Sequence, residues 1–494
     1  MHTHYTLDRF IRHRIGSLAL LLTILATVGC TPTPIQPTVS ISDFNNEWKE
    51  EYLADERLPF SSENIVSNWW SLFDDVQLND LVIRAEQNNL DLRLAANRIA
   101  QMRAQLGVVD AKQGPQVSAF ASVDREDISD NSKFAALGAK PDGNSYWLGG
   151  VDISWELDLW GRLDYLFEGA RQGVNASVFD AAAVQVLVRA NVVSTYLNLR
   201  GAQQQLALLA REVGVSEETL TMTQSQFNNG VVGKAAVATS RAKLAHLKSR
   251  VEPAKARVHH FMNQLAWLTG EPPQALDALL SSKGQLPQVP KSIPLNLDSE
   301  LALQRPDIMS ASAHLKQATA TVGVANADFY PSISLNGRTG FEAFNSDQLS
   351  EWDSAFFVVG PSVYLPVFNG GKLQKRLKLS EEKQTAAALK YRKTVLQAWH
   401  EIDNALADLQ SIYAQHLSLQ EAYDEISLAL KHTEYGYEQG SMSKLDVLLA
   451  SEKVTQAAQR LSESQTGVNV ALVTLYKTLG GGWQHREPEE GGSL

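Results

Sequence analysis

Two very long helical stretches limit the folds open to this chain of 494 residues more than any other feature. From Arg162 to Asn229, apolar residues recur at steps of three and four, the spacing of helices that pack along their length. Lys372 to Gln439 repeats that pattern over the same length. Each stretch of about 68 residues corresponds to roughly 100 Å of α-helix at about 1.5 Å per residue. A compact globular domain has no room for such rods, so the sequence predicts long helices packed side by side.

The long stretches belong to two copies of one pattern. Short motifs recur at an offset of about 210 residues: Gly161–Leu163 as Gly371–Leu373, Phe227–Val237 as Tyr437–Val447, and Leu268–Gly270 as Thr478–Gly480. Such self-similarity predicts two structural repeats, residues 67–270 and 299–480, joined by a proline-containing linker over 271–298.

Each repeat is expected to run helix, strand, strand, long helix, helix. The expected strands are about 116–124, 147–157, 332–341 and 356–365, the long helices 162–229 and 372–439, and the final helices 235–268 and 445–478. Pro253 should bend the first of these final helices. Residues 481–494 should form a flexible tail.

The first residues have the composition of an export signal. Arg9, Arg12 and Arg14 precede an apolar run, which ends at Gly29-Cys30. This order predicts a lipoprotein signal peptide over 1–29, a covalent lipid on Cys30, and a lipidated tether over 30–66. An ordinary secreted protein with an incidental cysteine is the alternative. Because the chain has one cysteine, it can form no internal disulfide.

Composition and motifs exclude several classes of protein. The net charge is −11 and no domain-sized basic stretch is present, which argues against a nucleic-acid partner. The sequence has no Walker loop, no dinucleotide fingerprint and no Cys/His metal spacing. We therefore expect no enzyme, no metal site and no cofactor besides the lipid.

The predicted strands alternate between apolar and polar residues. Trp147, Ile153 and Trp155 alternate with Asp152 and Ser154, and 332–341 behaves in the same way. The strand 116–124 is a weaker example, and 356–365 is more apolar throughout. Strands of about 9–11 residues are long enough to cross a bilayer when tilted.

These strands need partners from outside one chain. After the signal, no uninterrupted run of about 18 apolar residues could form a membrane helix. Four strands cannot close a barrel, since roughly eight is the minimum, and an open edge is not tolerated in lipid. Two, three or four copies would supply eight, twelve or sixteen strands, and the pattern alone leaves these alternatives open.

Several motifs resemble a known family, the TolC-type outer-membrane factors, and especially their NodT-like lipoprotein branch. They are Trp69-Trp70, Asn89–Leu92, Arg305–Ile308, Val322–Ala325 and Phe329–Ser332. The resemblance implies a mainly α protein with a membrane β part: a homotrimer whose twelve-stranded β-barrel is continued by a twelve-helix α-barrel. It also implies an outer-membrane location, with the helical barrel in the periplasm.

The resemblance further implies a function and partners. The chain would be the passive exit duct of a tripartite efflux pump for drugs or other small toxic compounds. Its partners would be itself, a periplasmic adaptor protein, an inner-membrane pump and outer-membrane lipid. Two alternatives stay open: an exit duct for type I protein secretion or for an ATP-driven exporter, and a lipid-anchored helical scaffold with no pore.

The turns after the long helices are the candidate working parts. The resemblance implies that an adaptor docks on these tips, which are Gly230, Val231, Val232, Gly233, Gly440, Ser441, Met442 and Ser443. The family implies a periplasmic gate at Asp446 and Leu449, where Leu449 takes the place of a second acid. Glycine at a helix end and an acid in a first helical turn also have purely structural explanations.

Other conspicuous residues have a structural reading beside the functional one. An aromatic girdle at the bilayer edges could be formed by Trp147, Trp155, Tyr330, Phe341 and Tyr364, although some of them are expected to pack at the junction of barrel and helices instead. The basic group Lys372, Lys375, Arg376 and Lys378 could face lipid headgroups or could simply be a solvated helix face. Trp69, Trp70 and Phe73 are expected to be packing anchors rather than a ligand site.

Overall fold

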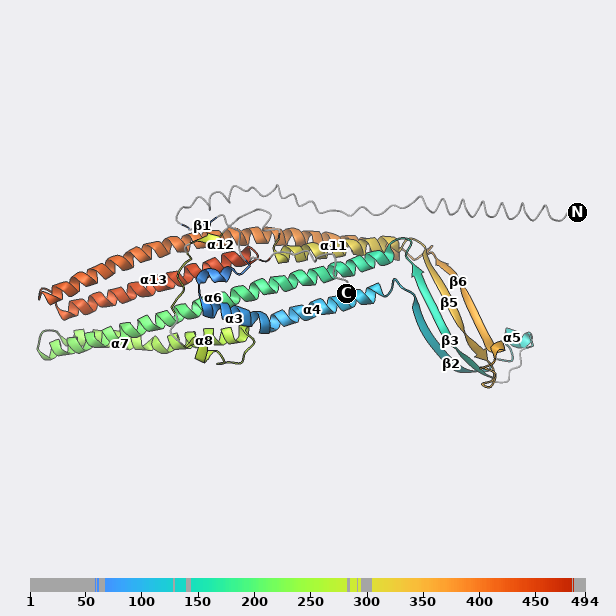
Figure 1. Cartoon of the computed structure of the whole chain (residues 1–494), viewed down its shortest axis with the longest axis horizontal. Coiled ribbons are helices and arrows are strands. Elements are labelled where there is room, and N and C mark those ends of the chain that lie inside the picture. The colour runs from blue at the N-terminus through green and yellow to red at the C-terminus, as the bar shows by residue number, and fades with distance from the viewer. Residues whose placement is uncertain are drawn as a thin grey trace. The chain divides into compact units, whose positions relative to one another are not determined.

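The computed structural model describes residues 58, 60–61, 67–127, 129–138, 144–281, 285–290, 292–294, 304–481 and 483 (Figure 1). They form two compact units. The strand unit comprises residues 112–166 and 319–382, and the helical unit comprises the described residues of 39–111, 167–318 and 383–494. The expected signal peptide 1–29, the lipidation site Cys30 and most of the tether lie outside the described residues.

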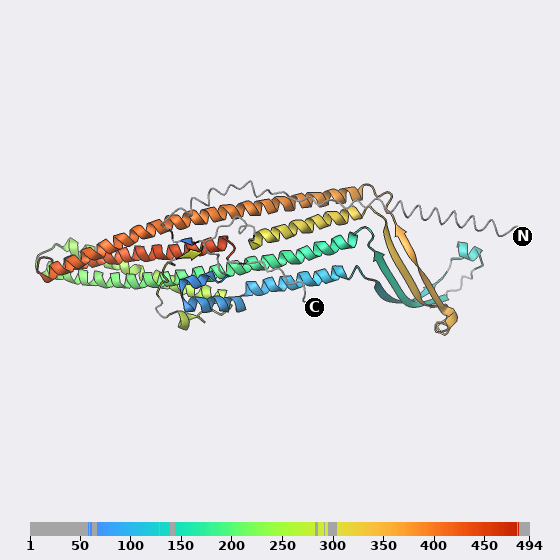
Figure 2. The ribbon, with the colours of Figure 1, turned by 45° about the horizontal axis from the view of Figure 1, so that its top comes forward.

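Two helices of 67 residues dominate the chain, α6 (Arg162–Asn228) and α12 (Lys372–Glu438). Each is followed by helices that return beside it, as Figures 1 and 2 show. The return path after α6 consists of α7 (Lys234–Ser249) and α8 (Val251–Leu268), and after α12 it is the single helix α13 (Lys444–Thr478). The helix lengths are those that the apolar spacing predicts.

The return path after α6 differs from the single bent helix expected over 235–268. α7 ends at Ser249 and α8 begins at Val251, so the helix is interrupted three residues before Pro253. Pro253 is thereby the third residue of α8. In a first helical turn the missing N–H of proline costs nothing, because backbone N–H groups there have no intrahelical acceptor. The interruption falls at Arg250, whose backbone angles stay in the helical region (φ −85°, ψ −16°), close to where the proline was expected to disturb the helix.

A hydrophobic core holds the helical unit together around Trp69, which is 1% exposed. Trp69 lies in the short helix η2 (Trp69–Phe73), and its ring stacks on that of Tyr476 at 5.2 Å between centroids. The next helix, α3 (Val76–Asn88), is capped by Asp75, which also accepts a hydrogen bond from the Tyr196 hydroxyl at 2.7 Å. The tryptophan motif thus fastens this segment to α6 and α13, as packing anchors do.

Segments expected to be featureless take part in this core. Leu58 is buried, and β1 (Phe60–Ser61) pairs in parallel with β4 (Ile293–Pro294), so the predicted tether and linker both contain structured residues. The linker also contains α9 (Asp277–Leu280). At the other end, Trp483 packs edge-on against Phe179. Isolated apolar residues within these polar segments, such as Leu58 and Ile293, are the local signal of this packing.

Among the described residues, one helix is long and apolar enough to be a candidate membrane span. α6 contains an 18-residue window that is apolar enough to cross a bilayer by length and composition alone. Core helices pass the same test, and α6 contributes Val192, Leu197 and Leu199 to the buried core. We therefore assign α6 to the core.

The strand unit is built on one four-stranded antiparallel sheet in the order β2-β3-β5-β6. Its strands are β2 (Gln116–Glu126), β3 (Asn144–Leu157), β5 (Ser332–Ala343) and β6 (Ala355–Tyr364). The central pairing of β3 with β5 joins the two halves of the sequence. The other described elements are α4 (Leu90–Asp110), α5 (Lys133–Ala136), α11 (Pro306–Ala327) and η3 (Trp352–Ser354).

The two central strands approach closely at a glycine pair. Gly150 lies opposite Gly340, and a Cβ atom added to Gly150 would lie 2.3 Å from the carbonyl oxygen of Thr339. A real Cβ atom cannot occupy that position. Glycine is therefore required there by the close contact between β3 and β5, as at other tight backbone approaches in sheets.

Candidate functional site

The sheet has two chemically different faces. Because directly paired residues in a sheet point to the same side, each register row belongs to one face. One row contains Ser118, Asp152, Arg338 and Val358, and the next row contains Val117, Ile153, Gly337 and Val359. The same alternation continues along the strands, so the sheet has a polar face and an apolar face.

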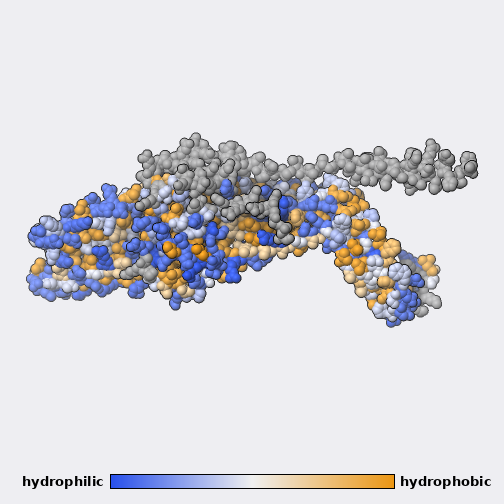
Figure 3. Space-filling model, viewed as in Figure 1, coloured by the Kyte–Doolittle hydropathy of each residue, from blue (hydrophilic) through white to orange (hydrophobic). Residues whose placement is uncertain are grey.

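The apolar face is exposed. Its large members with more than a third of their surface accessible are Val117, Val123, Ile153, Trp155, Leu335, Phe341, Phe357, Val359 and Val363. Figure 3 shows hydrophobic surface over this part of the chain. A contiguous exposed apolar patch of this kind marks contact with a membrane or with another protein.

The polar face contains an ion pair at its centre. The guanidinium of Arg338 contacts the Asp152 carboxylate through two hydrogen bonds of 2.7 and 3.1 Å, and it lies 4.4 Å from the ring centroid of Phe120. Ser154 donates to the Asn336 side chain at 2.9 Å. Sequence reasoning missed the ion pair, because Asp152 and Arg338 are 186 positions apart and no local pattern relates them.

Both outer edges of the sheet lack a partner among the described residues. β2 and β6 each pair on one side only. Since all three pairings are antiparallel, β2 and β6 run in opposite directions. The β6 edge of one copy can therefore pair in antiparallel fashion with the β2 edge of another.

The five aromatic residues expected to form a girdle divide into three groups. Trp147, Trp155 and Phe341 lie in rows of the apolar face. Tyr364 pairs with Ser332 and so lies on the polar face, which corrects its expected place. Tyr330 precedes β5, and its ring stacks on that of Trp160 at 5.1 Å between centroids. Within a strand, alternate residues point to opposite faces, so the position of each residue along the strand decides its face. Tyr330 lies before β5 begins, so this rule does not apply to it.

The two turns after the long helices share one backbone geometry. Gly230 and Gly440 have φ angles of +76° and +77°, in the left-handed region that favours glycine. Val231 N–H donates to the Gln226 carbonyl, and Ser441 N–H donates to the Gly436 carbonyl, both at 2.8 Å. This is the Schellman ending of a helix. Both turns lie at the same end of the helical unit (Figures 1 and 2).

The side chains of the two turns differ where the next helix begins. Ser443 caps α13, and the Asp446 carboxylate accepts hydrogen bonds from the Ser443 N–H at 2.8 Å and the Ser443 hydroxyl at 2.7 Å. These bonds hold the pKa of Asp446 below its ordinary value of 3.8. The equivalent cap of α7 is Gly233, which has no side chain to form such a bond.

The remaining tip residues are largely solvent-accessible. Gly230, Val231, Gly233, Gly440, Ser441, Met442 and Ser443 are exposed, and Val232 is half-buried. Leu449 is 42% exposed, although its neighbours Val447 and Leu448 are buried. The sequence therefore identified accessible turns, and Asp446 has at least the local role of completing a helix cap.

Polar contacts join the two helix hairpins. Lys243 of α7 forms an ion pair with Glu452 of α13. The side chains of Gln456 and Gln459 donate to the Glu212 carboxylate at 3.3 and 3.0 Å. These partners are more than 200 positions apart and carry no local sequence signal.

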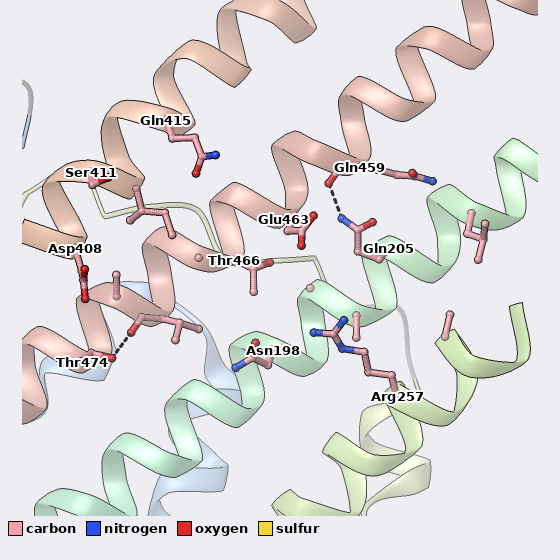
Figure 4. Close-up of a pocket in the computed structure, with 18 of the residues that line it drawn as sticks. Asn198, Gln205, Arg257, Asp408, Ser411, Gln415, Gln459, Glu463, Thr466 and Thr474 are labelled. Atoms are coloured by element: carbon pink, nitrogen blue, oxygen red, sulfur yellow. Dashed lines mark hydrogen bonds between the residues drawn. The ribbon is translucent and has the colours of Figure 1, made fainter. Parts of the chain in front are cut away.

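A hollow of about 920 Å³ lies between α6, α8, α12 and α13 (Figure 4). Gln205 crosses it to donate to the Gln459 carbonyl at 2.6 Å. Its polar and charged lining includes Asn198, Gln205, Arg257, Asp408, Ser411, Gln415, Gln459, Glu463, Thr466 and Thr474, and small or apolar residues such as Ala202, Leu209 and Ile412 line it as well. The opposite side of α13 is covered, because Gln465 and Asn469 both donate to the Pro287 carbonyl. The helical wall thus has one covered face and one open face of mixed polar and apolar lining.

Known proteins with similar sequences are outer-membrane and efflux proteins. The chain is 31% identical to the cation efflux system protein CusC of Escherichia coli over 475 residues, 93% of this chain and 97% of that protein. It is 29% identical to the probable outer membrane lipoprotein SilC of Salmonella typhimurium over 419 residues, 84% of this chain and 88% of that protein.

Solved structures with a similar fold are outer membrane channels as well. The CmeC outer membrane channel of Campylobacter jejuni matches with a TM-score of 0.79 at 29% identity, covering 89% of this chain and 93% of that one. The profile of the outer membrane efflux protein family matches twice, at residues 81–271 and 297–481. The chain therefore belongs to the outer membrane efflux protein family.

Proposed function

We propose that three copies of this chain form one passive duct, through which an inner-membrane pump exports small compounds across the outer membrane. The observation that carries the proposal is the sheet: its apolar face is exposed and its two edges are unpaired among the described residues. Unpaired backbone groups are too costly in lipid, so a sheet with this face in a bilayer must be closed by other copies. A closed ring of copies is a duct.

Strand direction supports closure in this manner. The opposite directions of β2 and β6 make every new pairing antiparallel, as in membrane barrels. Three copies would give twelve strands, the number that the family resemblance implies. The two family matches at 81–271 and 297–481 support two structural repeats in each copy, so that twelve helices would line the α-barrel.

The exposed turns are the proposed contact with a periplasmic adaptor. Gly230–Gly233 and Gly440–Ser443 lie at one end of the helical unit and present backbone and short side chains. We assign a periplasmic constriction to Asp446 and Leu449 in the same region. Because Ala236 stands at the place of Asp446 in the first half, a ring of three copies would carry three carboxylates rather than six.

In this proposal the inner-membrane pump, and not the duct, selects which compounds are exported. Similar proteins are named for different exports: CusC for cations, OpmQ for pyoverdine and SrpC for solvents. A duct with no catalytic role fits that variety. A lipid on Cys30 would anchor the chain in the outer membrane, and SilC is named as a lipoprotein.

Cysteine cross-linking tests closure. Ser118→Cys in β2 is combined in turn with Val358→Cys, Gly360→Cys or Ser362→Cys in β6, all on the polar face. Oxidation of the full-length protein in membranes should give covalent trimers for at least one combination. Ser154→Cys in the interior strand β3 replaces Ser118→Cys as the control and should give none. Covalent dimers as the end product, or no inter-copy bond at any position, would overturn the three-copy ring.

Planar bilayers test the duct itself. The purified trimer should conduct ions, and deletion of the gene should raise accumulation of small toxic compounds in cells. A trimer without conductance under any condition would favour the scaffold. Unchanged accumulation together with loss of a secreted protein would favour type I secretion.

A further inference from the structure

The segment between β6 and α12 combines exposed apolar and basic side chains. Val367 and Phe368 are 89% and 90% exposed, among the most accessible large apolar residues of the chain. Lys372 and Lys375 follow in the first turn of α12 and are exposed as well. Exposure to water is unfavourable for the apolar side chains of Val367 and Phe368 and favourable for the two lysines.

The basic residues of this turn differ in whether they have a partner. Arg376 forms an ion pair with Asp328 at 2.9 Å, and Lys378 lies 3.0 Å from Glu382. Neither Lys372 nor Lys375 forms an ion pair with any residue that the structure describes. The first turn of α12 contains no acidic residue either. Two lysines therefore remain available for an external anion.

The first half of the chain provides an internal comparison. Alignment of Gly161–Leu163 with Gly371–Leu373 places Asp158 opposite Phe368. The Asp158 carboxylate accepts hydrogen bonds from the N–H groups of Leu163 and Asp164 at 2.9 and 2.8 Å, so α6 has an anion of its own at its start. At the same place the second half has an exposed phenyl ring beside lysines.

A hollow of about 360 Å³ adjoins this turn and includes Lys372 in its lining. Trp160 and Tyr330 also line it, together with the acidic residues Glu156, Asp158 and Asp328. The Trp160 indole donates to the Pro331 carbonyl at 2.7 Å, which fixes its ring. The ring of Tyr330 stacks on that of Trp160. Tryptophan and tyrosine rings near a lysine are typical of the level at which a membrane protein meets phospholipid headgroups.

The geometry points to a binding site for an anionic phospholipid at this turn. Val367 and Phe368 enter the acyl region, continuing the exposed apolar face of β6, and Lys372 and Lys375 contact the headgroup phosphate. The site rests on the proposed function, because it needs the sheet to lie in a bilayer. A phospholipid fits better than free phosphate, since only a lipid satisfies the apolar and the basic residues together.

Lipid selectivity of the reconstituted trimer tests the site. Spin-labelled phosphatidylglycerol and phosphatidylcholine are compared for association with the full-length protein in vesicles of phosphatidylcholine. The wild type should prefer phosphatidylglycerol. Lys372→Ala/Lys375→Ala should lower that preference by about fivefold for each lysine, the effect of one basic residue near an anionic surface.

Lys390→Ala/Lys393→Ala is the matched control. These lysines have the same spacing in α12, are exposed, and form no ion pair with a described residue. Both double variants lose the same charge, so only a local site distinguishes them. Equal preference for phosphatidylglycerol in both double variants would overturn the proposal.

Two further measurements separate the remaining outcomes. Phe368→Ser should weaken association of both lipids at this turn and leave headgroup preference in place. If inorganic phosphate at millimolar concentration removes the preference, the ligand is free phosphate and the lipid site is wrong. Conductance is recorded for each variant: a conducting trimer without lipid preference refutes only this site, whereas a protein that neither inserts nor conducts refutes the proposed function.

Discussion

Val358 and Val359 offer a direct test of which side of the sheet faces lipid. They are adjacent in β6, they are the same residue type, and they are 66% and 68% exposed in a single copy. They differ only in face: Val358 shares a row with Asp152 and Arg338, whereas Val359 shares a row with Ile153 and Gly337. We predict that Val359→Lys destabilises the assembled protein far more than Val358→Lys.

The magnitude follows from the medium that each lysine meets. A lysine on the lipid face of a membrane barrel costs about 2–4 kcal/mol near the bilayer midplane, and Val359 lies close to the middle of β6. A lysine at 358 would stand opposite Arg338, and like charges in a cross-strand pair cost at most about 1 kcal/mol. The expected difference is therefore about 1–3 kcal/mol for each copy.

Refolding from urea into phospholipid vesicles measures the difference. The folded fraction of wild type, Val358→Lys and Val359→Lys is followed by the heat-modifiable mobility of the assembled protein. If the sheet were a water-exposed layer, Val359→Lys would lie within about 0.5 kcal/mol of the wild type, and Val358→Lys would cost at most about 1 kcal/mol. Equal stability of the two variants would refute the lipid-facing assignment, and a larger loss at 358 would reverse it.

Three further predictions concern the core, the tip and the strand contact. Trp69→Ala should cost about 3–5 kcal/mol in the free energy of unfolding, whereas Trp69→Phe should be near neutral, because the buried Trp69 N–H has no acceptor among the described residues and its removal offsets the lost area; thermal unfolding in detergent checks both. If Asp446 lines the duct, the difference in cation selectivity between wild type and Asp446→Asn should persist as pH falls below 3.8, and Ser443→Ala should shift its loss to higher pH; reversal potentials measured against pH decide. Gly150→Val should abolish assembly in the membrane, seen as loss of the trimer band, because its Cβ would overlap a backbone oxygen of β5.

Periodicity in the sequence predicts the elements well because it reflects local physics. Alternation with a period of two identified β3 and β5 and their two faces, whereas β2 alternates more weakly and β6 was expected from an apolar run. Spacing by threes and fours identified α6 and α12. The register of β3 against β5 could not be predicted, because it relates residues about 190 positions apart and no local rule fixes it. The same limit hid the Asp152–Arg338 ion pair.

The sequence predicted those parts of the candidate site that depend on neighbouring residues in the chain. Glycine at Gly230 and Gly440 marks the two turns, and a serine three residues before Asp446 is the sequence sign of a helix cap. What such motifs cannot reveal is whether the carboxylate serves only the cap. In the structure Asp446 is committed to Ser443 through one oxygen, Oδ2, so its cap and a gate role are compatible.

The two halves of the chain share a backbone plan but carry different charges at the ends of their long helices. At the start of the helices, the first half has the capping carboxylate of Asp158 and an Arg162 that is paired with Glu156. The second half has Phe368 and a Lys372 that forms no ion pair with a described residue. At the turns, the first half has Gly233 and the second has Ser443 and Asp446. A ring of three copies with six similar hairpins would therefore repeat its charges three times and not six. Contacts that depend on backbone shape could use all six hairpins, whereas contacts that depend on charge, with lipid at one end or cations at the other, would be limited to the three second halves.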